Sequence, residues 1–84
     1  MSLKDQFEDA QVRVKKLPKS PGNDGLLKLY SLYKQATTGD CSTKRPGMMD
    51  FAGRAKWDAW NGLKGKSSDA AMQEYVDFVT SLGA

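Results

Sequence analysis

Two tyrosines and a lysine lie close together between Leu29 and Asp40, where their spacing could create a binding face. Tyr30, Tyr33 and Lys34 occupy positions i, i+3 and i+4, so on a helix their side chains share one face. Phenolic hydroxyls beside an ammonium suit a phosphate ester, and a flat phenol ring suits stacking on a base. The pattern predicts a site for an anionic, partly aromatic ligand.

A second segment, from Gly53 to Asn61, adds another lysine in an aromatic setting. Lys56 shares a helix face with Ala52 and Trp60, which is also typical of a lysine whose stem covers apolar surface. Tyrosines at helical spacing are often core rings, and Lys34 alone would be an ordinary surface charge. The residues alone therefore leave a helical binding module and a plain helical core as alternatives.

The composition indicates one small domain, spanning residues 1–84. Hydrophobic residues make up 39% and charged residues 27% of the chain, as in globular proteins. A core of this size leaves little room for an enclosed cavity, so we expect a ligand to lie in a groove between elements. The net charge of +3 favours an anionic partner only mildly.

Several kinds of chemistry lack the residues they need. The chain has no histidine, which removes the commonest general base and metal ligand, so neither an enzyme nor a metal site is expected. Cys41 is the one cysteine, which excludes an intrachain disulfide and suits a reducing compartment. The first residues do not resemble a signal peptide, and no apolar run approaches the ~20 residues of a membrane span. We expect a cytoplasmic protein without a cofactor.

The first half of the chain predicts two helices. The first covers roughly 3–16, because apolar residues recur at helical spacing and Pro18 follows. The second begins after a cap at Asn23 or Asp24 and stops at Gly39. It is apolar around much of its circumference, so we expect it to be the central helix. The apolar stripe of the first helix consists of Leu3, Phe7, Ala10, Val14 and Leu17.

The second half predicts two more helices after a long loop. Asp50 can cap a third helix that runs to about Gly65, and Ser67 can cap a fourth. Tyr75, Val79 and Leu82 of the fourth helix are expected to pack on the stripe of the first. The loop before Asp50 could span up to about 40 Å when extended, against about 24 Å for the second helix. The chain is therefore predicted to be an all-α four-helix bundle, in which a parallel central pair is permitted.

Longer segments carry a likeness to a known family. They are Tyr30–Thr37, Gly39–Asp40, Arg45–Met48, Asp50–Phe51, Ala55–Asn61, Leu63–Gly65, Ala71–Met72 and Tyr75. Together they resemble the acyl-CoA-binding protein family, also called diazepam-binding inhibitor. The likeness runs without gaps from Phe7 to about Val79, which makes it more specific than any short motif. It implies an up-down-down-up bundle in which the second and third helices are parallel.

The resemblance also implies how the CoA head group is held. Tyr30, Lys34 and Lys56 would bind the 3′-phosphate. Tyr33 would stack on adenine, and Tyr75 would close nearby from the fourth helix. Because the CoA head carries several negative charges, converging lysines have a physical reason to be there.

Other positions match the family's binding stretch and its acyl site. Lys15 matches a head-group contact, and Ser31 and Leu32 belong to the binding stretch between Tyr30 and Lys34. The acyl chain would lie between the second and third helices, near Leu27 and Phe51.

Three residues depart from the family pattern. Gln11 stands where a small apolar residue is usual, and we expect it near the acyl end of the site, where it would affect the preferred chain length. Gly25 and Gly62 stand where better helix formers are common, at a cost of roughly 1 kcal/mol each inside a helix.

The family implies a non-catalytic, monomeric, cytoplasmic carrier of medium- to long-chain acyl-CoA esters. Its further partners would be acyl-CoA-using enzymes and transient membrane surfaces, and no nucleic acid is expected. The alternative is a helical module that binds another nucleotide or a nucleic acid through the same Tyr/Lys face. Nucleic-acid binding would weaken steeply with salt and would ignore acyl-chain length.

Overall fold

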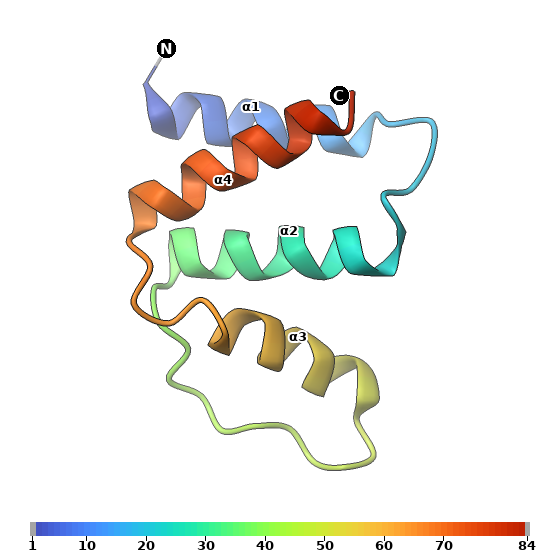
Figure 1. The fold of residues 1–84 in the computed structure, drawn as a ribbon, viewed down its shortest axis with the longest axis vertical. Helices are drawn as coiled ribbons and strands as arrows, with labels where there is room; N and C mark the ends of the chain where they lie inside the picture. Colours follow the sequence, from blue (N-terminus) through green and yellow to red (C-terminus); the bar gives the residue numbers. More distant parts are fainter. Residues whose placement is uncertain (1, 84) are drawn as a thin grey trace.

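Four α-helices form the fold in the computed structural model, which describes residues 2–83. Figure 1 shows α2 in the middle of the molecule, with α3 below it and with α4 and α1 above it. The helix α2 packs against both α3 and α4, and α1 packs against α4. The prediction of an all-α protein with a central second helix is confirmed. The four helices are α1 (Leu3–Lys15), α2 (Gly22–Thr37), α3 (Phe51–Asn61) and α4 (Ser68–Ser81).

The helices α2 and α3 run in the same direction. In Figure 1 both begin on the right and end on the left, whereas α1 and α4 run from left to right. A parallel pair requires the chain to return to its starting end, and the loop 38–50 does so below α3. The observed order is up-down-down-up, as the resemblance implies.

The core lies where α1 and α4 meet α2. The ring of Phe7 contacts the ring of Tyr75 edge-on, with centroids 5.0 Å apart and an interplanar angle of 78°. Ala10, Leu32 and Val79 are buried beside them. The predicted pairing of the α1 stripe with Tyr75 and Val79 is confirmed for this part of the stripe. Leu82, predicted with them, is the C-cap residue of α4, is half-buried and does not belong to this core cluster.

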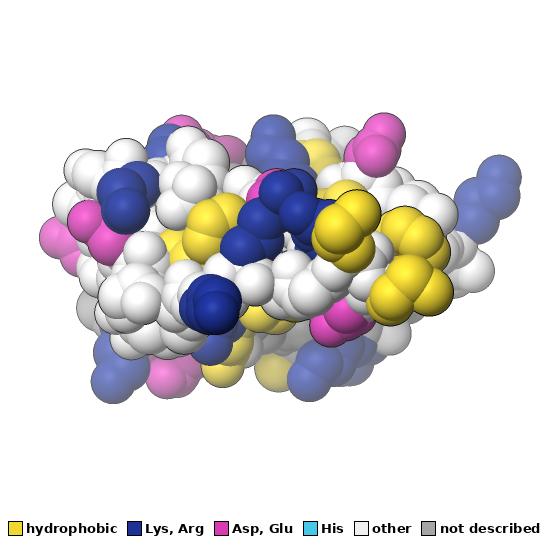
Figure 2. Space-filling view, turned by 90° about the horizontal axis from the view of Figure 1, so that it is seen from below, with side chains coloured by type: hydrophobic (Ala, Val, Ile, Leu, Met, Phe, Trp, Pro, Cys, Tyr) yellow, Lys and Arg dark blue, Asp and Glu magenta, His cyan; other side chains and the backbone are white. Residues whose placement is uncertain are grey.

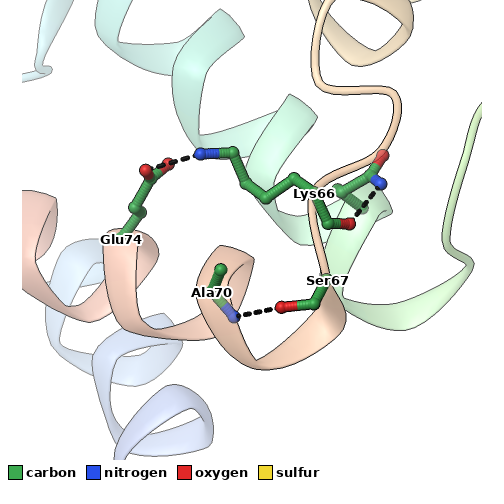
Figure 3. Close-up of polar contacts among 5 residues, drawn as sticks. Lys66, Ser67, Ala70 and Glu74 are labelled. Carbon is green, nitrogen blue, oxygen red and sulfur yellow. Dashed lines mark hydrogen bonds and ion pairs between the residues drawn. The ribbon is translucent and has the colours of Figure 1, made fainter.

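Side-chain caps set the starts of three helices. The Asp50 carboxylate accepts a hydrogen bond from the Gly53 amide at 3.0 Å at the start of α3, as predicted. Ser67 caps α4 in the same way by accepting from the Ala70 amide at 3.1 Å, which Figure 3 shows. Ser2 caps α1 by accepting from the Asp5 amide at 3.1 Å.

The start of α2 differs from the prediction. Neither Asn23 nor Asp24 caps it, because the helix already begins at Gly22 and Pro21 occupies the cap position without a side-chain hydrogen bond. Gly22 has a φ of 84°, a conformation that side chains rarely adopt. Gly25 lies inside the helix, where an added Cβ would stand 2.7 Å from the Pro21 Cβ. The glycine is thus required by close packing against Pro21.

The long loop is fastened along α3. The indole of the buried Trp60 donates to the Gly39 carbonyl at 2.8 Å, and that of Trp57 donates to the Thr43 carbonyl at 2.9 Å. Arg45 makes two hydrogen bonds to the Asp58 carboxylate, at 3.0 and 2.7 Å. The helix α3 ends at Asn61 rather than near Gly65, and a turn follows. The hydrogen bonds of Trp60, Trp57 and Arg45 therefore hold the loop along α3.

A buried amide joins the end of α2 to the connection between α3 and α4. The Nε2 atom of Gln35, which is fully buried, donates to Asp40 Oδ1 and to the Lys66 carbonyl, both at 2.8 Å. The Gly65 amide donates to the same Asp40 oxygen at 2.8 Å. The Gly65 amide and the Gln35 side chain hold the pKa of Asp40 below its usual value. Figure 3 shows Lys66 reaching on to Glu74 of α4.

Candidate ligand-binding site

A cavity of about 310 Å³, which we call the aromatic cavity, lies where α1, α2 and α4 approach one another. Four of the residues that line it were singled out from the sequence: Lys15, Tyr30, Tyr33 and Tyr75. The remaining lining residues are Gln11, Val14 and Leu29. Three phenol rings and one ammonium therefore surround a space that opens on the surface.

The ring of Tyr33 is supported on one side only. It stacks on Phe7, with centroids 6.0 Å apart and an interplanar angle of 26°. The residue nevertheless keeps 40% of its surface exposed. A flat ring that is backed by another ring and open to solvent is suited to stacking on a base.

Tyr75, unlike Tyr33, is buried, with only 5% of its surface exposed. Its burial, and to a smaller extent the neighbouring phenol of Tyr33, raises the pKa of Tyr75 above its ordinary value of 10.0. At neutral pH its hydroxyl is therefore protonated and can donate a hydrogen bond into the cavity.

An apolar groove of about 450 Å³ lies between α2 and α3. Leu27 and Phe51, the two residues predicted to contact an acyl chain, both line it. Lys56 also lines the groove, so a charged group stands beside apolar surface, as an amphipathic ligand requires. The groove is lined by Asn23, Leu26, Leu27, Phe51, Ala52, Ala55 and Lys56.

Two lysine–ring contacts cross the α2–α3 interface, and one of them connects the groove with the aromatic cavity. The Nζ atom of Lys56 lies 5.5 Å from the centroid of the Tyr30 ring, so a groove residue touches a cavity residue. The Nζ atom of Lys34 lies 4.9 Å from the centroid of the Trp60 ring. Within residues 2–83, neither lysine forms an ion pair with a carboxylate. Both charges are therefore available to an anion.

Three residues of the predicted binding stretch, Ser31, Leu32 and Lys34, line neither space, and Lys34 lies over Trp60 instead. Leu32 is buried in the core, and Ser31 is buried with its hydroxyl donating to the Lys28 carbonyl at 2.9 Å. Their position suits them to fixing the helix that carries Tyr30 and Lys34. Their predicted part in ligand binding stays a prediction.

Gln11 was expected near the acyl end of the site, and the structure does not place it at the groove that Leu27 and Phe51 line. It lines the aromatic cavity beside Tyr33 and Tyr75, and it does not line the apolar groove. It also lines a neighbouring cavity of about 350 Å³ that shares Tyr33. Its side chain makes one long hydrogen bond, from Nε2 to the Phe7 carbonyl at 3.4 Å. The reason is the packing of α1 on α4, whose geometry the sequence periodicity does not specify.

Some residues of the site were not singled out from the sequence. Phe7 backs the Tyr33 ring and Trp60 lies beneath Lys34, but both were interpreted only as core residues. Leu26 and Ala55 line the groove. A signal for Leu26 exists, because it stands one helical turn before Tyr30 and shares its face.

Neither a metal cluster nor a membrane span is found among residues 2–83. No group of three or more His, Cys, Asp or Glu side chains in this range could hold a metal ion. No helix in the same range is long and apolar enough to cross a membrane.

Comparison with known proteins shows the family. The acyl-CoA-binding protein family model matches residues 4–79. The chain is 52% identical over 82 residues to the acyl-CoA-binding protein homolog of Drosophila melanogaster, covering 98% of this chain and 95% of the relative. This chain belongs to the acyl-CoA-binding protein family, as the sequence motifs indicated.

Solved structures agree with the fold. The crystal structure of Oryza sativa acyl-CoA-binding protein 2 superposes with a TM-score of 0.91 at 43% identity. The match covers 96% of this chain and 90% of that one. The all-α, four-helix fold is therefore that of the family.

An enzyme relative matches only in part. Enoyl-CoA delta isomerase 2 of Rattus norvegicus is 53% identical over 78 residues, which is 93% of this chain but only 20% of the isomerase. The full-length relatives are acyl-CoA-binding proteins. The prediction of a binding protein rather than an enzyme is confirmed by these full-length relatives.

Proposed function

We propose that this protein binds medium- to long-chain acyl-CoA esters one to one, without chemistry, and that residues 1–84 act as one binding domain. The observation that carries the proposal is the contact between Lys56 and Tyr30, which joins an apolar groove to an aromatic cavity. An acyl-CoA has the same two parts, an apolar chain and an anionic, aromatic head.

The head group is assigned to the aromatic cavity and the lysines beside it. Tyr30, Lys34 and Lys56 hold the 3′-phosphate, because a phenol and two ammonium groups that have no carboxylate partner among residues 2–83 lie along the α2–α3 interface. Each charge-assisted hydrogen bond contributes roughly 1.5–3 kcal/mol. Tyr33 stacks on adenine with its exposed face, for roughly 1–3 kcal/mol.

Lys15 and Tyr75 complete the head-group site. Both line the aromatic cavity, from α1 and α4 respectively. Lys15 supplies a third cation to the phosphates, and the protonated hydroxyl of Tyr75 supplies a donor. Ser31 and Leu32 act through the helix, because both are buried.

The acyl chain is assigned to the groove along Leu27 and Phe51. A volume of about 450 Å³ falls within the roughly 300–1,000 Å³ that is typical of ligand pockets. Burial of a sixteen-carbon chain could contribute at most about 12–13 kcal/mol, at about 0.8 kcal/mol per methylene. Only part is realised, because an open groove leaves some of the chain in water and immobilisation opposes binding. The acyl chain of the ligand supplies most of the binding affinity, and the CoA head group supplies specificity for the CoA ester over the free fatty acid.

In the cell, the proposed role is to buffer and transport acyl-CoA as a cytoplasmic monomer. Acyl-CoA-using enzymes and membrane surfaces would be the partners between which the ligand moves. Family membership and the absence of a membrane-spanning helix among residues 2–83 support this role.

Isothermal titration with palmitoyl-CoA, beside free CoA and free palmitate, tests the proposal. We expect saturable one-to-one binding of the thioester and much weaker binding of both fragments. Equal affinities for palmitate and palmitoyl-CoA would refute the proposal that the CoA head group sets the specificity. A lack of saturable palmitoyl-CoA binding would refute the function itself.

A further inference from the structure

The aromatic cavity has one carboxamide on its wall, that of Gln11, among the residues that the structure describes. On α1, Gln11, Val14 and Lys15 stand at positions i, i+3 and i+4, so one face of this helix carries all three to the cavity. Of the described residues, Gln11 and Tyr33 are the two that line both this cavity and the neighbouring one of about 350 Å³. The amide therefore lies beside the Tyr33 ring.

The hydrogen-bonding capacity of this amide is mostly unused. A carboxamide can donate two hydrogen bonds, and its oxygen can accept two. The bond from Gln11 Nε2 to the Phe7 carbonyl is 3.4 Å long, beyond the usual range for an N–H donor and an oxygen acceptor. Within residues 2–83, no hydrogen bond to Gln11 Oε1 is found. The half-buried side chain thus keeps one N–H and its whole acceptor for a ligand.

Phe7 positions both the stacking ring and the amide. Its ring backs the ring of Tyr33, and its carbonyl holds Nε2 of Gln11. Phe7 itself is fixed in the core, with 3% of its surface exposed. Exchanging the places of Nε2 and Oε1 would bring two acceptor oxygens together at the Phe7 carbonyl, which is unfavourable. The amide is therefore oriented with Oε1 free, next to the ring on which a base would stack.

An amide in a fixed orientation can distinguish one purine from another. The edge of adenine presents its 6-amino group, a donor, beside a ring nitrogen that accepts. A glutamine complements this edge, because Oε1 accepts from the amino group while Nε2 donates to the ring nitrogen. Hypoxanthine has a carbonyl oxygen in place of the amino group. That oxygen would face Gln11 Oε1, acceptor against acceptor.

The charges of the protein do not supply such selectivity. Figure 2 shows Lys and Arg side chains on the face that the loop and α3 form. An ammonium group attracts the phosphates of any nucleotide, because a Coulomb attraction to phosphate does not depend on the base. Stacking on Tyr33 is also tolerant of the base. Selection of a base therefore requires a hydrogen-bonding group at its edge.

We propose that Gln11 makes the site selective for adenine, by accepting from the 6-amino group and donating to the adjacent ring nitrogen of a base that is stacked on Tyr33. The inference rests on the proposed acyl-CoA binding and adds to it a residue that determines the base. Gln11 stands where the family usually has a small apolar residue, which has no hydrogen-bonding group to offer. The selectivity therefore belongs to this chain and is not carried over from the family pattern.

Isothermal titration with two esters that differ only in the base tests the proposal. The probes are palmitoyl-CoA and its hypoxanthine analogue. We expect the wild type to bind palmitoyl-CoA at least about fivefold more tightly than the analogue. Gln11→Met keeps a side chain of similar length without its amide, so it should bind the two esters within about twofold of each other. Gln11→Ala, which restores a small apolar residue, should lose the preference in the same way.

A matched control and a spectroscopic readout separate recognition of the base from a structural role. Gln73 on α4 is exposed, donates to Asp77 at 2.9 Å and lines neither the aromatic cavity nor the groove. Gln73→Met should therefore keep the wild-type ratio of the two affinities. In a ¹H–¹⁵N spectrum, the side-chain amide signals of Gln11 are identified by their absence from Gln11→Met. They should shift to lower field with palmitoyl-CoA and shift less with the analogue.

Two results would overturn the inference and leave the proposed function intact. One is a wild type that binds both esters saturably and with equal affinity. The other is a Gln11→Met variant that keeps the wild-type preference for adenine, since another residue would then select the base. A preference that disappears equally in Gln73→Met would also overturn the role of Gln11. A lack of saturable palmitoyl-CoA binding by the wild type would instead refute the proposed function, and the inference with it.

Discussion

The ammonium of Lys56 on α3 lies 5.5 Å from the centre of the Tyr30 ring on α2, and this contact joins the two parts of the site. Four residues further along both helices, the arrangement recurs with the roles exchanged: Lys34 on α2 lies 4.9 Å from the centre of the Trp60 ring on α3. Because α2 and α3 run in the same direction, four residues along α2 and four residues along α3 lead to the same level of the interface. Two ammonium groups therefore lie along the same α2–α3 interface, each over an aromatic ring of the facing helix.

Replacing Lys34 by methionine tests this arrangement. Lys34→Met keeps an apolar stem over Trp60 but removes the charge, so palmitoyl-CoA binding should weaken by about 10- to 100-fold, corresponding to roughly 1.5–3 kcal/mol. Isothermal titration measures the change. The effect should be small on free palmitate, which lacks the phosphates.

The chain offers a matched control for this substitution. Lys28 is also on α2, and its Nζ lies 4.6 Å from the centre of the Phe78 ring, away from the proposed site. Lys28→Met should leave the affinity for palmitoyl-CoA within about twofold of the wild type, since distant exposed charges are screened by salt. Equal losses in both variants would show that net charge, not the α2–α3 interface, determines binding.

The sequence predicted that Tyr30 and Tyr33 lie together because this relationship is local, and both line the aromatic cavity. Lys34 shares their face by spacing, but its ammonium lies over Trp60 of α3. Lys56 was singled out from its aromatic setting, and the family likeness supplied Lys15 and Tyr75 from other helices. Gln11 was misplaced for the opposite reason. Its distance from the groove depends on how α1 crosses its neighbours, which periodicity does not encode. The burial of Ser31 was also not foreseen, since one helix face does not show how far a neighbouring helix covers it.

The corrected position of Gln11 leads to a second prediction. Because Gln11 lines the aromatic cavity and not the groove, Gln11→Ala should change head-group binding and leave chain-length preference unchanged. Loss of one amide contact should weaken acyl-CoA binding by about 2- to 10-fold, or roughly 0.5–1.5 kcal/mol.

Titration with dodecanoyl-CoA and palmitoyl-CoA distinguishes the two positions of Gln11. The ratio of the two affinities should be the same in Gln11→Ala and in the wild type. A variant whose preference moves toward longer or shorter chains would restore the original assignment to the acyl end.

The buried phenol of Tyr75 predicts a dependence of stability on pH. Its pKa is raised in the folded protein, so the unfolded chain loses this proton first as the pH rises above about 10. Between the two pKa values the folded state holds more protons than the unfolded state, and the free energy of unfolding falls as the pH rises. Below that range the contribution is fully present.

Urea denaturation between about pH 8 and pH 11 measures this effect. Tyr75→Phe should lose stability less steeply over this range than the wild type, because the variant has no buried phenol to ionise. Tyr30→Phe is the control, since Tyr30 is not in the buried core, and it should keep the wild-type slope. Parallel curves for the wild type and Tyr75→Phe would contradict the prediction.

Gly25 and Gly62 were both interpreted from the sequence as poor helix formers. In the structure, the two glycines differ in the space available for a side chain. An alanine Cβ at position 25 would stand 2.7 Å from the ring carbon of Pro21, which cannot move aside easily. At Gly62, the residue after α3, the nearest atoms are backbone oxygens at 3.4 and 3.5 Å, and its φ of −65° suits any residue.

The two alanine variants should therefore change stability in opposite directions. Gly25→Ala should lower the free energy of unfolding by about 1–3 kcal/mol through overpacking, despite the better helix propensity of alanine. Gly62→Ala should raise it by up to about 1 kcal/mol, because the unfolded chain loses conformational freedom and the folded chain is not strained. Urea denaturation of both variants compares them directly. A stabilised Gly25→Ala would mean that α2 can shift away from Pro21, and that the close approach at the start of this helix is not what requires the glycine.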